Sequence, residues 1–244
     1  MRYELFYWPG IQGRGEFVRL ALEDAGADYL DVARSRGKGR GVEAMLRLMG
    51  DPRLAHPPFA PPFLKAGDVL VAQTANILQF LGPRLGLVPR DEASRLWAHQ
   101  LQLTIADLVA EAHDTHHPIA GGLYYEEQKP EARKRARYFV RDRIPKYLGH
   151  FEKVLAADPA GRGHLVGARH SYADLSMFQA MAGLHYAFPK AMARLAPAHP
   201  RLEALCRRVR ARPRIAAYLA SKRRVPFNEQ DVFRHYPELE RAAR

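Results

Sequence analysis

The sequence is poor in cysteine and in long apolar stretches, and both shortages limit what the chain can be. Cys206 is the single cysteine among 244 residues, so no disulfide can form within the chain, which favours a reducing cytosol. No stretch approaches the roughly 18 consecutive apolar residues that a membrane-spanning helix requires, and the N-terminus MRYELFYWPG has no apolar signal-peptide core. We therefore expect a cytoplasmic protein without a membrane segment or a targeting segment.

Acidic residues are few relative to basic ones, which gives a formal net charge of +12 at pH 7. Much of the excess lies in EARKRARYFVRDR, ALCRRVRARPR and SKRR, where apolar residues recur at helical spacing, as on the solvated faces of amphipathic helices. No zinc-finger or RNA-binding signature accompanies the charge, so we expect no nucleic-acid partner. Steering of a small anionic ligand fits the charge better.

The first part of the chain alternates between strand and helix patterns. Short aromatic or β-branched runs predict strands, and apolar residues three and four apart predict helices. The predicted order is strand 2–8, helix 13–25, strand 29–33, helix 41–50, a hairpin of strands 63–66 and 69–71, and helix 74–82.

Strand signals disappear beyond PRLGLVPRD, Pro83 to Asp91, whose two prolines and glycine indicate a linker. Four longer segments show helical spacing, and Pro145 predicts a kink in the second of them. These helices are predicted at residues 94–113, 136–157, 172–187 and 201–211. Ser171 and Asp174 have the spacing of a capping box, which we interpret as a folding device.

Two features, one at each end of the predicted hairpin, suggest a ligand site. In FAPPFL, Phe59 to Leu64, prolines precede a strand, and a cis proline there would turn backbone groups outward, where a peptide-like ligand can pair with them. Gln73 and Thr74 lie where a strand gives way to a helix, so a helix N-terminus and a hydroxyl can hold a carboxylate. An ordinary hairpin followed by a capped helix would explain the same signals.

The order of elements and five motifs together resemble the cytosolic glutathione transferases over nearly the whole chain. The motifs are Tyr7 at the end of the first strand, GRGEFVRLAL, PPFL, QTANILQFL and the helical second half. The resemblance, to tyrosine-type enzymes of the bacterial and fungal kind, implies a thioredoxin-like N-terminal domain (1–83), a linker (84–91) and an all-α C-terminal domain (92–244). It also implies a homodimer, and glutathione as a co-substrate without a further cofactor.

The resemblance assigns Tyr7 as the catalytic residue, whose hydroxyl donates a hydrogen bond to the glutathione sulfur. A free thiol titrates near pH 8.5, so a donor that favours the anion by about two pK units makes the thiolate dominant at neutral pH. Tyr7 could instead be an ordinary half-buried strand tyrosine, and Tyr3 lies too early in the strand to match. The remaining residues that the resemblance places around glutathione are Trp8, Arg14, Lys38, Arg40, Pro61, Pro62, Gln73, Thr74 and Asp107.

Three of these assignments have alternatives or a cost. Asp107 matches an acidic residue that reaches across the dimer, or it is a solvent-facing helix charge; Arg14 may instead only form a structural ion pair. Pro62 matches a cis proline of the family. In the family, the residue before the cis proline normally offers its N–H to glutathione. Pro61 occupies that position and has no N–H, and a lost neutral hydrogen bond is worth about 0.5–1.5 kcal/mol.

HDTHHP, His113 to Pro118, places His113 and His117 four residues apart on one helical face. Two histidines without a third placed ligand seldom make a metal site, so we expect none. The resemblance instead places His113, His117 and Tyr124 around a pocket for the hydrophobic electrophile.

The predicted function is therefore conjugation of the glutathione thiolate to hydrophobic electrophiles, a detoxification chemistry. The alternatives are a non-catalytic carrier of apolar anions on the same scaffold and a glutathione-dependent isomerase or reductase.

Overall fold

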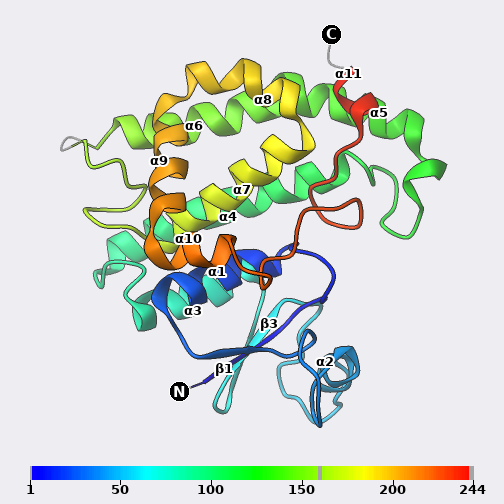
Figure 1. Cartoon of the computed structure of the whole chain (residues 1–244), viewed down its shortest axis with the longest axis vertical. Coiled ribbons are helices and arrows are strands. Elements are labelled where there is room, and N and C mark those ends of the chain that lie inside the picture. Colours follow the sequence, from blue (N-terminus) through cyan, green and yellow to red (C-terminus); the bar gives the residue numbers. More distant parts are fainter. Residues whose placement is uncertain (1, 159–160, 242–244) are drawn as a thin grey trace.

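The computed structural model of the chain describes residues 2–158 and 161–241. A four-stranded sheet with three helices forms the lower part of the molecule, and a group of helices lies above it (Figure 1). The elements of the lower part are β1 (Tyr3–Phe6), α1 (Gly15–Ala25), β2 (Tyr29–Asp31), α2 (Val42–Met49), β3 (Phe63–Ala66), β4 (Val69–Ala72) and α3 (Thr74–Leu85).

The sheet has the strand order β2-β1-β3-β4, with β1 and β2 parallel and the other two pairs antiparallel. Side chains alternate between the two faces of a strand. Leu5 accordingly packs with Val18 of α1 and Ile77 of α3, whereas its neighbour Phe6 packs with Met45 of α2. The sheet thus has α1 and α3 on one face and α2 on the other, which is a thioredoxin-like arrangement.

Helices and irregular segments, without a strand, make up the described residues of the upper part. Its long helix α4 begins after Asp91, whose side chain accepts a hydrogen bond from the Ser94 N–H at 2.8 Å, and it packs against α7, which is buried along nearly its whole length. The helices are α4 (Glu92–Asp114), α5 (Lys129–Tyr138), α6 (Ile144–Ala156), α7 (Tyr172–Ala187), α8 (Pro189–Leu195), α9 (Pro200–Ala211), α10 (Pro213–Leu219) and α11 (Pro237–Arg241).

The observed boundaries differ from the sequence prediction in several places, among them the start of α5 at Lys129, before the helix predicted at 136–157. Helix α3 continues through Pro83 to Leu85 and ends at Gly86, so it runs into the segment that we predicted as a linker. The helix predicted at 136–157 is divided by a π-helical turn, Phe139–Arg143, just before Pro145, which has no N–H for a regular helical bond. Helices α8 and α10 begin at prolines and were not predicted, because each has only seven residues.

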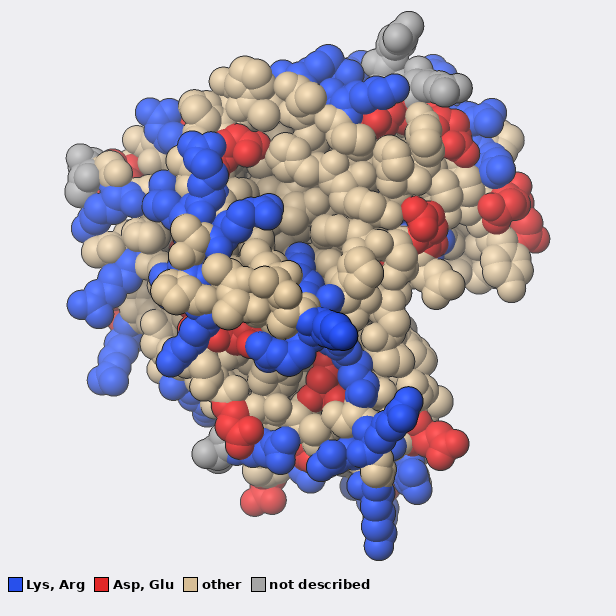
Figure 2. Space-filling model, viewed as in Figure 1, with Lys and Arg blue, Asp and Glu red and all other residues tan. Residues whose placement is uncertain are grey.

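Two of the three basic segments lie on the outside of amphipathic helices, as expected, whereas SKRR follows α10 in a turn and places Arg224 against the buried Glu16. In α9, Leu202, Leu205 and Val209 are buried, whereas Arg207 and Arg210 are exposed. On the face in Figure 2, Lys and Arg side chains are spread over both parts of the molecule with Asp and Glu between them. The described residues include no helix that is both long and apolar enough to cross a membrane.

The capping box predicted at the start of α7 is present. The Asp174 carboxylate accepts hydrogen bonds from the Ser171 N–H at 2.7 Å and the Ser171 hydroxyl at 2.7 Å, and it also accepts one from the Leu165 N–H at 2.9 Å. Asp174 is fully buried. It therefore holds the preceding loop as well as the end of the core helix.

We predict that Asp174→Ala lowers the free energy of unfolding by about 3 kcal/mol, because it leaves three buried donors without an acceptor. Ser171→Ala removes only the cap and should cost about 1 kcal/mol. Urea unfolding followed by circular dichroism measures both. Glu126→Ala, at an exposed position, is the control, and equal stability of the Asp174 and Glu126 variants would contradict the role.

Candidate functional site

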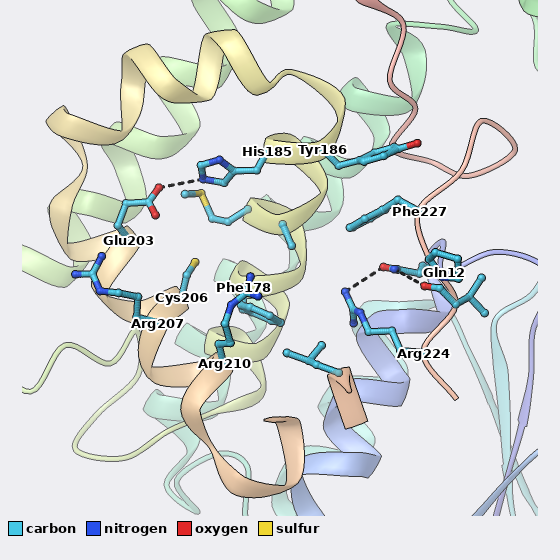
Figure 3. A pocket seen from close by; sticks show the side chains of 15 residues that line it. Gln12, Phe178, His185, Tyr186, Glu203, Cys206, Arg207, Arg210, Arg224 and Phe227 are labelled. Atoms are coloured by element: carbon cyan, nitrogen blue, oxygen red, sulfur yellow. Dashed lines mark hydrogen bonds and ion pairs between the residues drawn. The ribbon is translucent and has the colours of Figure 1, made fainter. Parts of the chain in front are cut away.

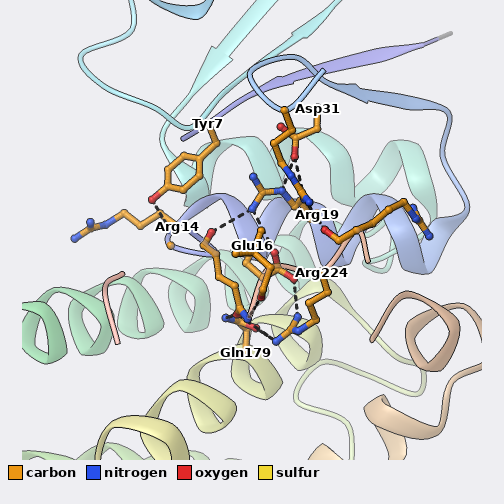
Figure 4. Close-up of polar contacts among 12 residues, drawn as sticks. Tyr7, Arg14, Glu16, Arg19, Asp31, Gln179 and Arg224 are labelled. Atoms are coloured by element: carbon orange, nitrogen blue, oxygen red, sulfur yellow. Dashed lines mark hydrogen bonds and ion pairs between the residues drawn. The ribbon is translucent and has the colours of Figure 1, made fainter. Parts of the chain in front are cut away.

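Tyr7 follows β1 and lies against the start of α1. Its side chain is only 3% exposed, and its hydroxyl oxygen accepts a hydrogen bond from the Arg14 N–H at 2.9 Å (Figure 4). A Cβ on Gly13 would lie 2.0 Å from this oxygen, and one on Gly15 would lie 2.5 Å from the ring. Only glycine fits at these two positions, so GRG is what allows the tyrosine to approach the helix.

The protonation state of Tyr7 follows from its surroundings. Burial raises the pKa of the phenol, with a further contribution from the negative charge of Asp231, while the Arg14 N–H acts in the opposite direction. The hydroxyl thus keeps its proton at neutral pH. Because its oxygen already accepts a bond from the backbone, the O–H is the group left to donate.

The loop before α1 is fixed by a carboxylate from the far end of the chain. Asp231 accepts hydrogen bonds from the N–H groups of Gln12 at 3.0 Å and Gly13 at 2.7 Å, and it is only 2% exposed. The Gln12 side chain also pairs with Gln179 of α7 at 2.8 Å. Sequence reasoning missed Asp231, because a separation of 218 residues leaves no local pattern to detect.

The first turn of α1 is held by a buried charge network (Figure 4). Glu16 has no exposed side-chain surface and lies 3.3 Å from Arg19 and 2.6 Å from Arg224, while the Tyr218 hydroxyl donates to it at 2.9 Å. Arg19 also pairs with Asp31 at 2.7 Å. The network therefore ties α1 to β2, α10 and the segment after α10.

Gln73 and Thr74 begin α3 beside this loop, as predicted. Gln73 has φ 69° and ψ 122° and is the one non-glycine residue with positive φ among the described residues. Such a conformation costs on the order of 1–3 kcal/mol and tends to occur at functional positions. The Thr74 hydroxyl donates to the Arg14 carbonyl at 3.3 Å, which joins the start of α3 to the start of α1.

A cavity of about 360 Å³ brings together three of the predicted glutathione residues, Arg14, Gln73 and Thr74. Its opposite wall is α4, which contributes His99 and Gln102. Gln102 is 1% exposed, and both its Oε1 and the His99 Nδ1 have no hydrogen-bond partner in the structure. Sequence reasoning missed both residues, since nothing in α4 indicates which of its polar side chains faces α3.

The other predicted glutathione residues lie outside this cavity. Pro62 follows a cis peptide bond, as expected, and is buried. Trp8 is 39% exposed next to Tyr7 in the chain, and Asp107 is exposed on α4. Lys38 and Arg40 lie on an exposed glycine-rich loop. Neither Tyr7 nor Pro61 lines a cavity found among the described residues.

Two of the three residues predicted for the electrophile pocket, His113 and His117, lie next to each other, whereas the third, Tyr124, is exposed at the surface. His113 and His117 are partly buried, with ring centroids 5.1 Å apart, and the buried His116 joins them. Burial, together with the charge of Arg234, lowers the pKa of His117 to about 4, and burial lowers the pKa of His116 to about 2, so both imidazoles are neutral at pH 7. Tyr124 is 77% exposed at the surface.

A larger cavity, of about 880 Å³, lies between α7, α9, α10 and residues 224–227 (Figure 3). Arg207, Arg210 and Arg224 lie around it, with Phe178 and Phe227 among its apolar side chains. It contains none of the residues predicted for glutathione or the electrophile. Size alone therefore does not identify the site.

Comparison with solved structures defines the class of fold. A Pi-class glutathione S-transferase of Onchocerca volvulus has a TM-score of 0.67 at 21% identity, covering 90% of this chain and 92% of its own. A prostaglandin synthase D of Nilaparvata lugens has a TM-score of 0.69 at 18% identity, covering 93% and 100%. The thioredoxin-like and all-helical parts thus form the glutathione transferase fold.

Sequence comparison agrees with the fold. The family model "Glutathione S-transferase, C-terminal domain" matches residues 113–222. Glutathione S-transferase P of Bos taurus is 26% identical over 223 residues, covering 90% of this chain and 92% of the relative, and the corresponding Xenopus laevis protein is 27% identical over 223 residues, covering 91% and 93%. These findings support a glutathione S-transferase and do not favour the non-catalytic carrier.

Proposed function

We propose that Tyr7 is the catalytic residue of a glutathione transferase and donates its O–H to the thiolate sulfur of glutathione. The observation that carries this role is the hydroxyl itself, held at 2.9 Å by the Arg14 N–H and kept protonated by the raised pKa that burial causes. A protonated phenol stabilises the thiolate and disfavours the neutral thiol, so it lowers the thiol pKa.

The chemistry needs little more than this donor and the proximity of the two reactants. The thiolate attacks a carbon electrophile, a carbon–sulfur bond forms, and a leaving group such as a halide departs with the electron pair of its bond. A hydrogen bond that stabilises the anion by two pK units corresponds to about 2.7 kcal/mol. Holding both reactants in one site supplies the remaining rate enhancement.

The tripeptide is held, in this proposal, by the cavity around Arg14, Gln73 and Thr74. The γ-glutamyl carboxylate lies at the start of α3, where unpaired helix N–H groups favour an anion. Trp8, Pro61 and Pro62 flank the cysteinyl part, and Lys38 or Arg40 holds the glycyl carboxylate.

The electrophile is proposed to lie on the α4 side of Tyr7, beside His113 and His117, with Tyr124 at the outer rim. Burial lowers the pKa of His113, and the positive charge of Arg14 acts in the same direction. The pocket would adjoin the thiolate. Hydrophobic electrophiles and a detoxification role follow from the same proposal.

We predict that Tyr7→Phe lowers turnover with an aryl halide about 100-fold and raises the apparent pKa of bound glutathione by about two units, because the thiolate loses its donor. Steady-state kinetics and thiolate absorbance against pH measure the two effects. Glutathione affinity should change little, because the tripeptide is held elsewhere.

Tyr3→Phe is the matched control, since Tyr3 lies in the adjoining strand β1 and is also buried. Unchanged turnover and an unchanged thiol pKa in the Tyr7 variant would contradict the role. Product mass separates conjugation from the isomerase and reductase alternatives, because only conjugation adds the electrophile to glutathione.

Gln102 is proposed to orient the γ-glutamyl end from the α4 wall. Its buried Oε1 has no hydrogen-bond partner, and Gln102 lines the same cavity as Gln73 and Thr74, from the opposite wall. A buried unpaired carbonyl is costly, and an ammonium group is the donor that would satisfy it. The γ-glutamyl ammonium of glutathione is such a donor.

We predict that Gln102→Leu weakens glutathione binding about tenfold, as expected for one hydrogen bond to a charged group. Glutathione acetylated on its amino group should bind wild type and variant equally. Calorimetry measures both, and the exposed Gln100→Leu is the control. If Gln102 only fills the core, the leucine variant will be as stable or more stable, with unchanged affinity, and the proposal fails.

A homodimer is proposed from the exposed face of α4. Leu96 and Leu103 are 60% and 48% exposed and lie seven residues apart on one helical face. Asp107 lies four residues after Leu103 on the same face, where a partner subunit would bring it toward the partner's glutathione. A cytoplasmic location is proposed as well, because the reaction needs reduced glutathione.

We predict that sedimentation gives twice the chain mass of 27.6 kDa, and that Leu96→Glu yields a folded monomer because it buries an unpaired charge in the interface. Ile119→Glu, at a position 59% exposed beyond α4, is the control and should stay dimeric. A monomeric wild-type protein would rule the dimer out.

A further inference from the structure

Three histidines gather at the C-terminal end of α4. One ring nitrogen of each of His113, His116 and His117 lies within 4.8 Å of the others. The helix ends with a tight turn, in which the N–H groups of His116 and His117 both donate to the His113 carbonyl, at 3.2 and 3.3 Å. The turn brings the second and third imidazoles beside the first. The sequence alone showed a helical pair without a placed third ligand.

His116 is oriented by a backbone group. Its Nε2 lies 2.9 Å from the Val232 carbonyl oxygen, and because a carbonyl only accepts, this nitrogen carries the hydrogen. The lone pair is therefore on Nδ1, which accepts a hydrogen bond from the Nδ1–H of His117 at 2.5 Å, and a metal ion would take the place of that hydrogen. Metal-binding histidines commonly donate their other ring N–H to a carbonyl or carboxylate in this way, which fixes the tautomer and the ring orientation.

The third imidazole has a carboxylate neighbour. Nδ1 of His113 lies 3.6 Å from a carboxylate oxygen of Asp114, and its ring centroid is 5.0 Å from that of His116. Three imidazoles and one carboxylate thus lie together at this end of α4.

We propose that His113, His116 and His117 bind one divalent transition-metal ion, for which Zn²⁺ is the probe. Imidazole nitrogen is a preferred ligand of zinc, copper and nickel, and three histidines leave the fourth position of a tetrahedral zinc ion open. The site adjoins the proposed electrophile pocket. It does not depend on glutathione chemistry, and its test uses protein free of glutathione, which itself binds zinc.

A second group, His164, His170 and Asp174, is a poorer candidate among the described residues. Both Asp174 oxygens already accept hydrogen bonds from the loop before α7 and from Ser171. His170 Nε2 lies 3.2 Å from an Asp24 carboxylate oxygen. These side chains are engaged in holding the fold together, so they offer fewer free lone pairs.

The test is calorimetric titration of ZnCl₂ into chelator-treated protein without a histidine tag. We expect one ion per chain, with affinity reduced about 100-fold or more in His113→Ala and in His117→Ala, because each removes a ligand. These two side chains are partly exposed, so the variants should fold, which thermal unfolding checks. Two control variants, the exposed His56→Ala and His164→Ala, should bind Zn²⁺ with the affinity and stoichiometry of the wild type.

Substitution with Co²⁺ gives a second readout. Its visible absorption bands report coordination by nitrogen, and they should disappear in the His113 and His117 variants but persist in the His56 variant. Absence of stoichiometric binding would overturn the proposal. Binding that survives in the His113 and His117 variants, or that is lost in His164→Ala, would overturn it as well.

Discussion

The ion pairs of the buried Glu16 carboxylate with two arginines are the interactions on which the rest of the site depends. The carboxylate pairs with the guanidinium groups of Arg19 and Arg224 and accepts a hydrogen bond from the Tyr218 hydroxyl. The Glu16 side chain has no exposed surface. Removing one member of such a cluster would leave charge buried and unpaired, which is strongly destabilising. The network fixes the first turn of α1 against the helical part. The Arg14 N–H that holds Tyr7 is two residues away.

Tyr7 shows how the fold selects one role for a versatile side chain. The phenol is buried between two glycines, so its pKa is raised and it stays protonated. A backbone N–H occupies its oxygen at 2.9 Å, which leaves the hydroxyl proton to donate. In a more exposed tyrosine, water would compete for both the accepted and the donated hydrogen bond of the hydroxyl. The same burial that makes a phenolate unfavourable makes the phenol a well-oriented donor.

Local patterns predicted the parts of the structure that depend on neighbours in sequence. The strands around Leu5 and Leu64, the helix of residues 172–187 and the Ser171–Asp174 capping box were all found this way, whereas the cis bond at Pro62 was expected from the family resemblance. The role of Asp231 was not predicted, because its hydrogen-bond partners are 218 and 219 residues away in the sequence. Gln102 was missed for a related reason. Which polar side chain of a helix faces a cavity or a turn is decided by tertiary packing.

The bonds from Asp231 to the loop before α1 have a consequence for how the protein is made. During synthesis the Gly13 N–H leaves the ribosome 218 residues before the Asp231 carboxylate that fixes it. At about 5–20 residues per second, that stretch takes on the order of ten seconds or more. Through that interval the loop beside Tyr7 lacks its anchor, so the site is complete only once Asp231 has been made.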